Sequence, residues 1–358
     1  MGFRVETGLL NPDTDQYAGK GQHIPGIRDV AEAASRVERL GFDGVFTPEA
    51  GHDPFLPLMT AAEHTERIAL GTNVAIAFPR SPMITAQLAW DLQHFSGGRF
   101  KLGLGTQVKG HNELRYATPW TAGPGPRLRE YLECIQAMFA SFADGQKAVP
   151  FEGEHYRFSL CPPFFNPGPI EYEAPPIYIA AVNKYMSRLG GELCRGLRLH
   201  PIGTFAYTRD VVLPTIAEGA KKADRPISDV DVVGAPFLAT GADEEAVVAA
   251  RRALKQHISF YASTRTYHGV LEYHGWEDVG ARLHQLSREG KWTELPDQIT
   301  DDMLDEWAVS ATFDELAGEI SSRCDGIFDT LLLDLPGRLM NDEDRVAELV
   351  SALQHGPA

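Results

Sequence analysis

The stretch "LGLGTQVKGHNE" (102–113) has the residue types and spacing that most invite a chemical interpretation. It begins as an apolar run with two glycines and then turns polar. A dinucleotide-binding loop would need a third glycine where Val108 stands, and a helix that begins inside the motif so that its N–H groups meet the pyrophosphate. The next helical pattern starts only near residue 126, which argues against such a loop. Two alternatives stay open: a glycine-tightened strand end, or a cofactor wall with hydrogen bonds from Thr106 and Gln107.

The elements that must position this stretch follow from an alternation along the chain. Short β-branched or aromatic runs alternate with amphipathic stretches, which is typical of parallel βα units. Strands are expected at 3–10, 43–47, 68–77, 99–105, 176–182, 196–202, 230–240 and 329–336. This number of units favours a closed (β/α)8 barrel, an α/β fold, over an open doubly wound sheet.

Two segments interrupt the alternation. A Pro-rich and aromatic excursion spans about 148–176, and a helical insertion spans about 262–312. Because neither breaks the order of the βα units, we expect a single barrel domain over 1–358 that includes both.

Composition excludes several classes of partner. The chain has 33 basic and 49 acidic residues and a net charge of -16, so nucleic acid is not an expected partner. No apolar run approaches the ~20 residues that span a bilayer, and the first residues lack a signal-peptide pattern, so we expect a cytoplasmic protein without a membrane partner. The four cysteines include no Cys-x-x-Cys pair, and the histidines lack carboxylates at ligand spacing, so no metal site is predicted.

In a (β/α)8 barrel, functional residues gather at the C-terminal ends of the strands. This rule selects the segments 47–53, 72–81, 105–113, 180–186 and 200–205. For His200 two orientations stay open, toward a cofactor at the mouth of the barrel or into the inner layer of core residues.

Three blocks carry a resemblance to a known family. They are "GFDGVFTPEAGHDPFLPL", "ERIALGTNVAIAFPRSPMITAQLAWDLQHFSGGRFKLGLGTQ" and "YIAAVNKYMSRLGGELCRGLRLHP". Together they resemble the bacterial luciferase-like superfamily and, more narrowly, its oxidoreductases that use the deazaflavin coenzyme F420. The resemblance covers essentially the whole chain and implies a luciferase-like TIM barrel that transfers a hydride between F420 and a small organic substrate, with a homodimer as the expected assembly. Two alternatives stay open: an FMN-dependent monooxygenase fed by a separate flavin reductase, and a non-catalytic deazaflavin-binding protein.

The resemblance also implies a cofactor site. The family has a non-prolyl cis peptide at the end of the third strand, backing the middle ring of the flavin or deazaflavin, and the matching bond is Asn73–Val74. The strand-four segment would meet the polyol of the cofactor, and the turn after strand five would meet its phosphate. The implied cofactor contacts are Glu49, Asn73, Val74, Gly105, Thr106, Gln107, Val182 and Asn183.

The chain departs from the family at the proton donor. Relatives that oxidise sugar phosphates or alcohols commonly carry Asp-His after strand two, where this chain has Glu49-Ala50. The predicted catalytic residues are therefore Glu49, His52 and His111, which could supply or remove a proton if their pKa lies near the working pH. Each has an alternative: Glu49 as a solvated loop acid, His52 as a capping or packing residue, and His111 as part of an exposed loop.

Overall fold

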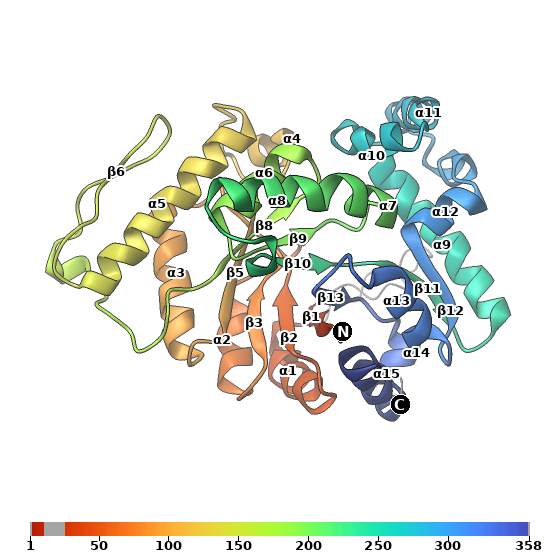
Figure 1. Cartoon of the computed structure of the whole chain (residues 1–358), viewed down its shortest axis with the longest axis horizontal. Helices are drawn as coiled ribbons and strands as arrows, with labels where there is room; N and C mark the ends of the chain where they lie inside the picture. Colours follow the sequence, from red (N-terminus) through yellow and green to blue (C-terminus); the bar gives the residue numbers. More distant parts are fainter. Residues whose placement is uncertain (1, 11–25, 357–358) are drawn as a thin grey trace.

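The computed structural model describes residues 2–10 and 26–356, and within these ranges eight parallel strands close into a barrel (Figure 1). The strands are β1 (Arg4–Gly8), β2 (Gly44–Thr47), β3 (Ala69–Thr72), β5 (Phe100–Gly105), β8 (Ile177–Ala181), β9 (Gly196–Leu199), β10 (Asp231–Gly234) and β13 (Thr330–Leu333), and β4 (Ala75–Ile76) continues β3 beside β5. Pairing follows the order β3-β2-β1-β13-β10-β9-β8-β5, and the pairing of β3 with β5 closes the ring. The predicted (β/α)8 barrel is confirmed.

Helices surround the barrel because each presents one apolar face to it. In α1, for example, Val30, Ala34 and Val37 are buried at the spacing of one helical face. The helices that pack around the strands are α1 (Val30–Arg39), α2 (Leu56–Glu63), α3 (Pro82–Phe95), α5 (Pro124–Asp144), α6 (Lys184–Leu193), α7 (Phe205–Tyr207), α8 (Leu213–Lys222), α13 (Leu316–Cys324), α14 (Gly337–Met340) and α15 (Glu343–His355). Ser81 starts α3 by accepting the N–H of Ile84, with Pro82 in the first turn.

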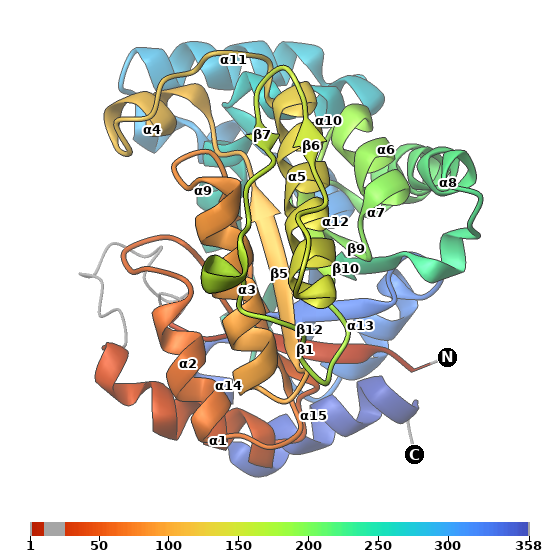
Figure 2. The same cartoon turned by 90° about the vertical axis from the view of Figure 1, so that its left-hand side faces the viewer.

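The excursion and the helical insertion lie outside the ring of strands. The excursion forms an antiparallel hairpin of β6 (Phe151–Glu152) and β7 (Arg157–Phe158), which packs along α5 (Figure 2). The insertion follows α9 (Glu244–Ala262) and comprises α10 (His268–Tyr273), α11 (Glu277–Arg288) and α12 (Asp301–Trp307). In Figure 2 the arrow of β5 points toward α10 and α11, so the insertion lies at the C-terminal end of the barrel.

The prediction of one strand over 230–240 is wrong, because this segment forms two strands that belong to two different sheets. β10 ends at Gly234, and β11 (Phe237–Gly241) pairs in parallel with β12 (Ala308–Thr312) outside the barrel. Pro236 lies between them, and a residue without a backbone N–H cannot continue the ladder.

A second correction concerns the chain after β5. A short helix, α4 (Lys109–Leu114), begins there, although the sequence suggested no helix before residue 126. Of its residues Asn112 alone is buried, so the segment lacks the apolar periodicity that reveals longer helices. Across the described ranges, no helix is long and apolar enough to cross a bilayer.

Candidate active site

The centre of the predicted site is a bulge between β3 and β4. Asn73 and Val74 interrupt the strand, and the peptide bond between them is cis. Gly105 faces this bulge from β5: a Cβ at Gly105 would stand 2.6 Å from Cγ2 of Val74. Two residues earlier on β5, a Cβ at Gly103 would stand 2.0 Å from the carbonyl oxygen of Thr72. The two glycines are therefore required for the close approach of the bulge to β5, and they keep the wall beside it free of side chains.

Glu49 supports the bulge from the loop after β2. Its Oε2 accepts the backbone N–H of Ile76 at 2.7 Å and Nη1 of Arg80 at 2.6 Å. The Glu49 side chain is 6% exposed, and Arg80 also donates to Asp53 at 3.0 Å. Burial alone would lower the pKa of Arg80, but its bonds to Glu49 and Asp53 raise it. The structure thus places Glu49 beside the bulge, as predicted from the sequence, but with one carboxylate oxygen committed to an ion pair.

The loop after β5 folds around the buried side chain of Asn112, which with His111 and Glu113 forms the group from which the sequence predicts one residue facing the pocket. Its Nδ2 donates to the carbonyl oxygens of Thr106 at 2.9 Å and Val108 at 3.1 Å, and its buried Oδ1 has no hydrogen-bond partner among the described residues. Gln107 has a φ of 55° and accepts the N–H of Val108 on its own Oε1. These contacts hold Thr106 and Gln107 at the end of β5, next to the bulge.

The structure does not bring the three predicted catalytic residues into one hydrogen-bonded group. His111 is exposed on α4, and His52 is half-buried in the loop after β2. No hydrogen bond links either histidine to Glu49 in the part of the chain that is described. A different residue, Tyr116, lies near Glu49: burial, and next to it the negative charge of Glu49, raise the pKa of its phenol. Nothing in the local sequence marks Tyr116 as a site residue.

Val182 and Asn183 lie where β8 passes into α6. Asn183 caps α6 by accepting the N–H of Met186 at 3.0 Å, so the first N–H groups of a ten-residue helix face the mouth of the barrel. Such a terminus favours an anion. The carbonyl oxygen of Val182 accepts the hydroxyl of Tyr207 at 3.4 Å.

His200 follows β9 and contacts one aromatic ring of α9 and one of the insertion. Its ring stacks on Tyr267 at 5.1 Å between centroids and meets Tyr261 edge-on at 4.6 Å. Its Nδ1 accepts the N–H of Ile202 at 3.1 Å, and burial, followed by the neighbouring His257, lowers its pKa to about 4. His200 is therefore neutral near pH 7, with its hydrogen on Nε2. Of the two orientations left open by the sequence, the structure favours the mouth of the barrel.

Comparison with known proteins identifies the family and the fold. A model of the family described as luciferase-like monooxygenase matches residues 8–330. The chain belongs to the luciferase-like monooxygenase family. It is 44% identical over 302 residues to an uncharacterized protein of Mycobacterium tuberculosis, covering 84% of this chain and 88% of that protein.

Two further relatives of this luciferase-like chain depend on F420. An F420-dependent glucose-6-phosphate dehydrogenase of Intrasporangium calvum is 27% identical over 349 residues, covering 91% of this chain and 93% of the enzyme. The structure of the coenzyme F420-dependent tetrahydromethanopterin reductase of Methanopyrus kandleri superimposes with a TM-score of 0.72 at 21% identity, covering 98% of this chain and 97% of that one. The latter likeness concerns the fold.

The interior of the luciferase-like barrel, here called the lumen, holds charged side chains on the N-terminal side of the bulge. Glu6 of β1 accepts a hydrogen bond from Lys101 of β5 and another from Arg198 of β9, each of 2.9 Å. Glu6 and Arg198 are fully buried. TIM-barrel interiors are more often filled by layers of branched aliphatic side chains, so this arrangement calls for a functional explanation.

A second carboxylate lies at the N-terminal end of the same lumen. Asp231 of β10 accepts hydrogen bonds of 2.8 Å each from Arg4, Tyr178 and Thr330. Burial alone would raise the pKa of Asp231, but the charges of Arg4 and Lys101 and the hydroxyl bonds hold it below its usual value. Asp231 is therefore ionised at neutral pH.

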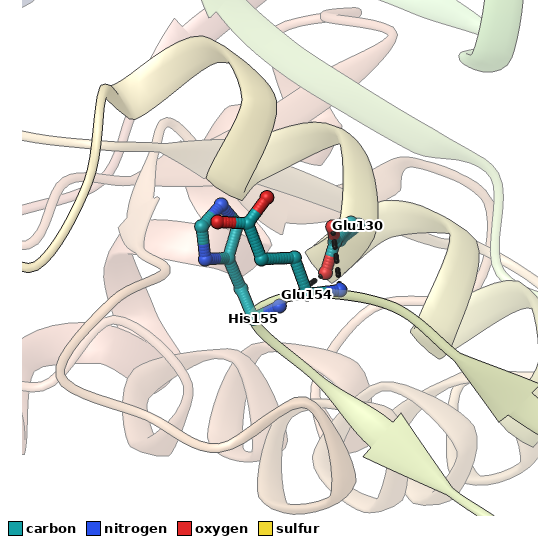
Figure 3. Close-up of side chains that lie close together, drawn as sticks. All are labelled: Glu130, Glu154 and His155. Carbon is teal, nitrogen blue, oxygen red and sulfur yellow. Dashed lines mark hydrogen bonds between the residues drawn. The ribbon is translucent and has the colours of Figure 1, made fainter.

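Among the described residues, one group of carboxylates and imidazole is compact enough to suggest a metal ion: Glu130, Glu154 and His155 (Figure 3). Glu130 of α5, however, uses its two carboxylate oxygens to accept the backbone N–H groups of Glu154, His155 and Tyr156, at 2.6 to 3.2 Å. This geometry is that of a carboxylate holding the turn of the β6–β7 hairpin against α5.

Proposed function

We propose that this chain is an F420-dependent oxidoreductase that transfers a hydride between the deazaflavin and a small organic substrate. The observation that carries the proposal is the bulge at Asn73–Val74, packed on Gly105 and held by Glu49, in a chain with F420-dependent relatives. When bound, the deazaflavin supplies a ring carbon that accepts or gives a hydride.

The residues present fit such a cofactor. A flat ring needs a wall without side chains, and the glycines of β5 supply one beside the bulge. A phosphate needs N–H donors, and the capped start of α6 after Asn183 presents them. Thr106 and Gln107, held in place by Asn112, would bind the polyol between ring and phosphate.

We assign Glu49 a positioning role in this proposal, because its carboxylate is bonded to Arg80 and to the N–H of Ile76. Proton transfer is left to His52 and His111. His200 is neutral at working pH, and its Nε2–H is suited to donate a hydrogen bond to a substrate oxygen at the mouth of the barrel.

The test is to titrate the purified protein with F420 and, separately, with FMN, following the fluorescence of each. We expect selective binding of F420 by the wild type and its loss in Gly105→Ala, whose added methyl group would collide with Val74. Gly318→Ala on α13 is the matched control, because a Cβ there meets nothing within 4 Å. Selective binding of FMN would instead place the chain among oxygen-using enzymes that need a flavin reductase, and binding of neither cofactor would refute the proposal.

We further propose a cytoplasmic homodimer. The four cysteines are free and buried, in keeping with a reducing compartment. On α3 two large apolar side chains, Ile84 and Phe95, are each 51% exposed and lie three turns apart on one face. Light scattering of the wild type and of Phe95→Asp tests this: we expect a dimer that weakens in the variant, and a monomeric wild type would contradict it.

A further inference from the structure

A short turn of the excursion, Pro163–Phe165, exposes two phenylalanine rings to solvent. Phe164 is 89% exposed and Phe165 is 66% exposed, and their rings meet edge to face at 5.1 Å between centroids. Leu160, a few residues earlier, is 78% exposed. Large apolar side chains gathered on a surface commonly mark a contact with another molecule.

Hydrogen bonds hold this turn in one conformation. Phe165 donates its N–H to the carbonyl oxygen of Pro162 at 2.8 Å. Nδ2 of Asn166 donates to the carbonyl oxygen of Ser141 on α5 at 2.8 Å, and Oδ1 of Asn166 accepts the N–H of Gly168 at 2.9 Å. The two phenylalanine rings, here called the Phe pair, are therefore held beside α5 and would lose little conformational freedom on docking.

The segment that follows the Phe pair packs on α3 (Figure 2). Nε1 of Trp90 donates to the carbonyl oxygen of Gly168 at 3.1 Å, and Nε2 of Gln93 donates to the carbonyl oxygen of Glu173 at 2.9 Å. Phe95, whose exposure supports the proposed homodimer, is on the same helix. The Phe pair thus adjoins the helix through which the homodimer is proposed.

An apolar groove lies between α5 and α6. It has a volume of about 370 Å³, and among the described residues no charged side chain lines it. Its long polar side chain, Gln136, donates to the carbonyl oxygen of Leu193 at 2.9 Å. The apolar walls of this α5–α6 groove include Phe139, Ala140 and Ala143 of α5, and Pro175 and Ile177 at the entry to β8.

The Phe pair and the α5–α6 groove flank the same helix. Ser141, whose carbonyl oxygen holds Asn166, is about 100° further round α5 than Ala140, which lines the groove. The exposure of Phe164 shows that the Phe pair does not fill the groove of its own chain. A twofold axis running along α5 would instead place the Phe pair of each copy over the groove of the other.

We propose that the two copies of the homodimer dock reciprocally in this way, with the Phe pair of each copy in the α5–α6 groove of its partner. The inference rests on the homodimer proposed above. A charged segment would lose its hydration in this groove without gaining a partner, whereas the Phe pair carries no charge. Because the chain has a net charge of -16, two copies repel one another, and contact through uncharged surfaces opposes the fewest charges.

The area supports the same occupant. Two phenylalanine rings at these exposures would bury about 300 Å², and the groove surface that they cover would add about as much. Two symmetric contacts then bury about 1,200 Å² in total, at which stable interfaces begin.

The first test is the dissociation constant of the dimer, measured by analytical ultracentrifugation. We expect Phe164→Asp to raise it about tenfold or more, because the substitution would bring a charge into an apolar groove. Ala143→Asp should have the same effect from the side of the groove. Leu114→Asp on α4 is the matched control, because Leu114 is 91% exposed and belongs to neither surface, and it should leave the dissociation constant unchanged. Circular dichroism checks that each variant is folded.

Cysteine cross-linking tests the pairing itself. The four natural cysteines are buried, so an introduced cysteine supplies the exposed thiol. When Phe165→Cys protein is mixed with Ala143→Cys protein, mild oxidation should give a disulfide-linked dimer. A mixture of Phe165→Cys with Gly318→Cys on α13, where a Cβ meets nothing within 4 Å, should not.

The outcomes separate this inference from the homodimer. A monomeric wild type refutes both. If Phe95→Asp weakens the dimer, but neither Phe164→Asp nor Ala143→Asp does and no cross-link forms, the inference is refuted and the homodimer stands.

Discussion

Replacing Glu49 with alanine tests whether its ion pair with Arg80 holds the bulge. The substitution removes the acceptor of two hydrogen bonds, one from Arg80 and one from the N–H of Ile76, at a side chain that is 6% exposed. Arg80 would be left with Asp53 and with the carbonyl oxygen of Ile76. The segment after the bulge would then lose its link to the loop after β2.

The expected cost follows from these contacts. Removing one partner of a buried ion pair costs about 3 to 5 kcal/mol of unfolding free energy, and the remaining bond of Arg80 to Asp53 should reduce this to about 3 kcal/mol. With about 2.1 cal/mol/K of unfolding entropy per residue, the 358 residues correspond to about 0.75 kcal/mol/K. Glu49→Ala should therefore lower Tm by about 4 °C. Glu49→Gln keeps an acceptor for Ile76 and should lose about half as much.

Thermal unfolding followed by circular dichroism measures the effect. Glu343→Ala is the matched control, because Glu343 forms an exposed ion pair with Arg36 that should contribute less than about 1 kcal/mol. A double-mutant cycle with Arg80→Ala should give a coupling energy of about 1 to 2 kcal/mol. A Glu49→Ala protein that unfolds at the wild-type temperature, or single effects that add without coupling, would refute the role assigned to the pair.

Three further predictions concern other parts of the chain. The pKa of His200 is about 4 in the folded protein and near 6.5 in the unfolded chain, so the contribution of neutral His200 to the unfolding free energy is complete above pH 6.5 and is lost as the pH falls toward 4. Between pH 6.5 and 4 the unfolding free energy of the wild type, measured by urea denaturation, should fall by about 3 kcal/mol more than that of His200→Gln, and an equal pH dependence of the two proteins would contradict the assignment. Arg99 donates five hydrogen bonds that tie β3 to the ends of α2 and α3, so Arg99→Met should lower the unfolding free energy by about 3 to 5 kcal/mol, and a urea midpoint close to that of the wild type would disprove this. Glu130→Ala should speed proteolytic cleavage within 153–156 without a large change in Tm, in contrast to Glu133→Ala on the same helix, and equal cleavage rates would show that the carboxylate does not hold the turn.

The order of the barrel strands could be predicted because it depends on local properties of the chain. Apolar runs of strand length separated by amphipathic stretches indicate parallel βα units, and the barrel rule then locates the site at the ends of the strands. In the structure the end of β5 and the start of α6 at Asn183 do lie at the C-terminal ends of barrel strands, and their role in a site stays a prediction. The same local signals failed where an element was too short or too exposed to show a period, as in α4, and where Pro236 divided one apolar run between two sheets.

The partners of the charged and titratable residues could not be predicted, because they are distant in the chain. Glu49 meets Arg80 across 31 residues, and Glu6 meets Arg198 across 192. Composition and periodicity describe each residue by its neighbours in sequence, whereas a pKa or an ion pair depends on what the closed barrel brings within a few ångströms. The order of the chain thus predicts at which strand ends chemistry could take place. The closure of the barrel determines that Glu49 is held, that His200 is neutral and that two N–H groups of Arg198 find no partner among the described residues.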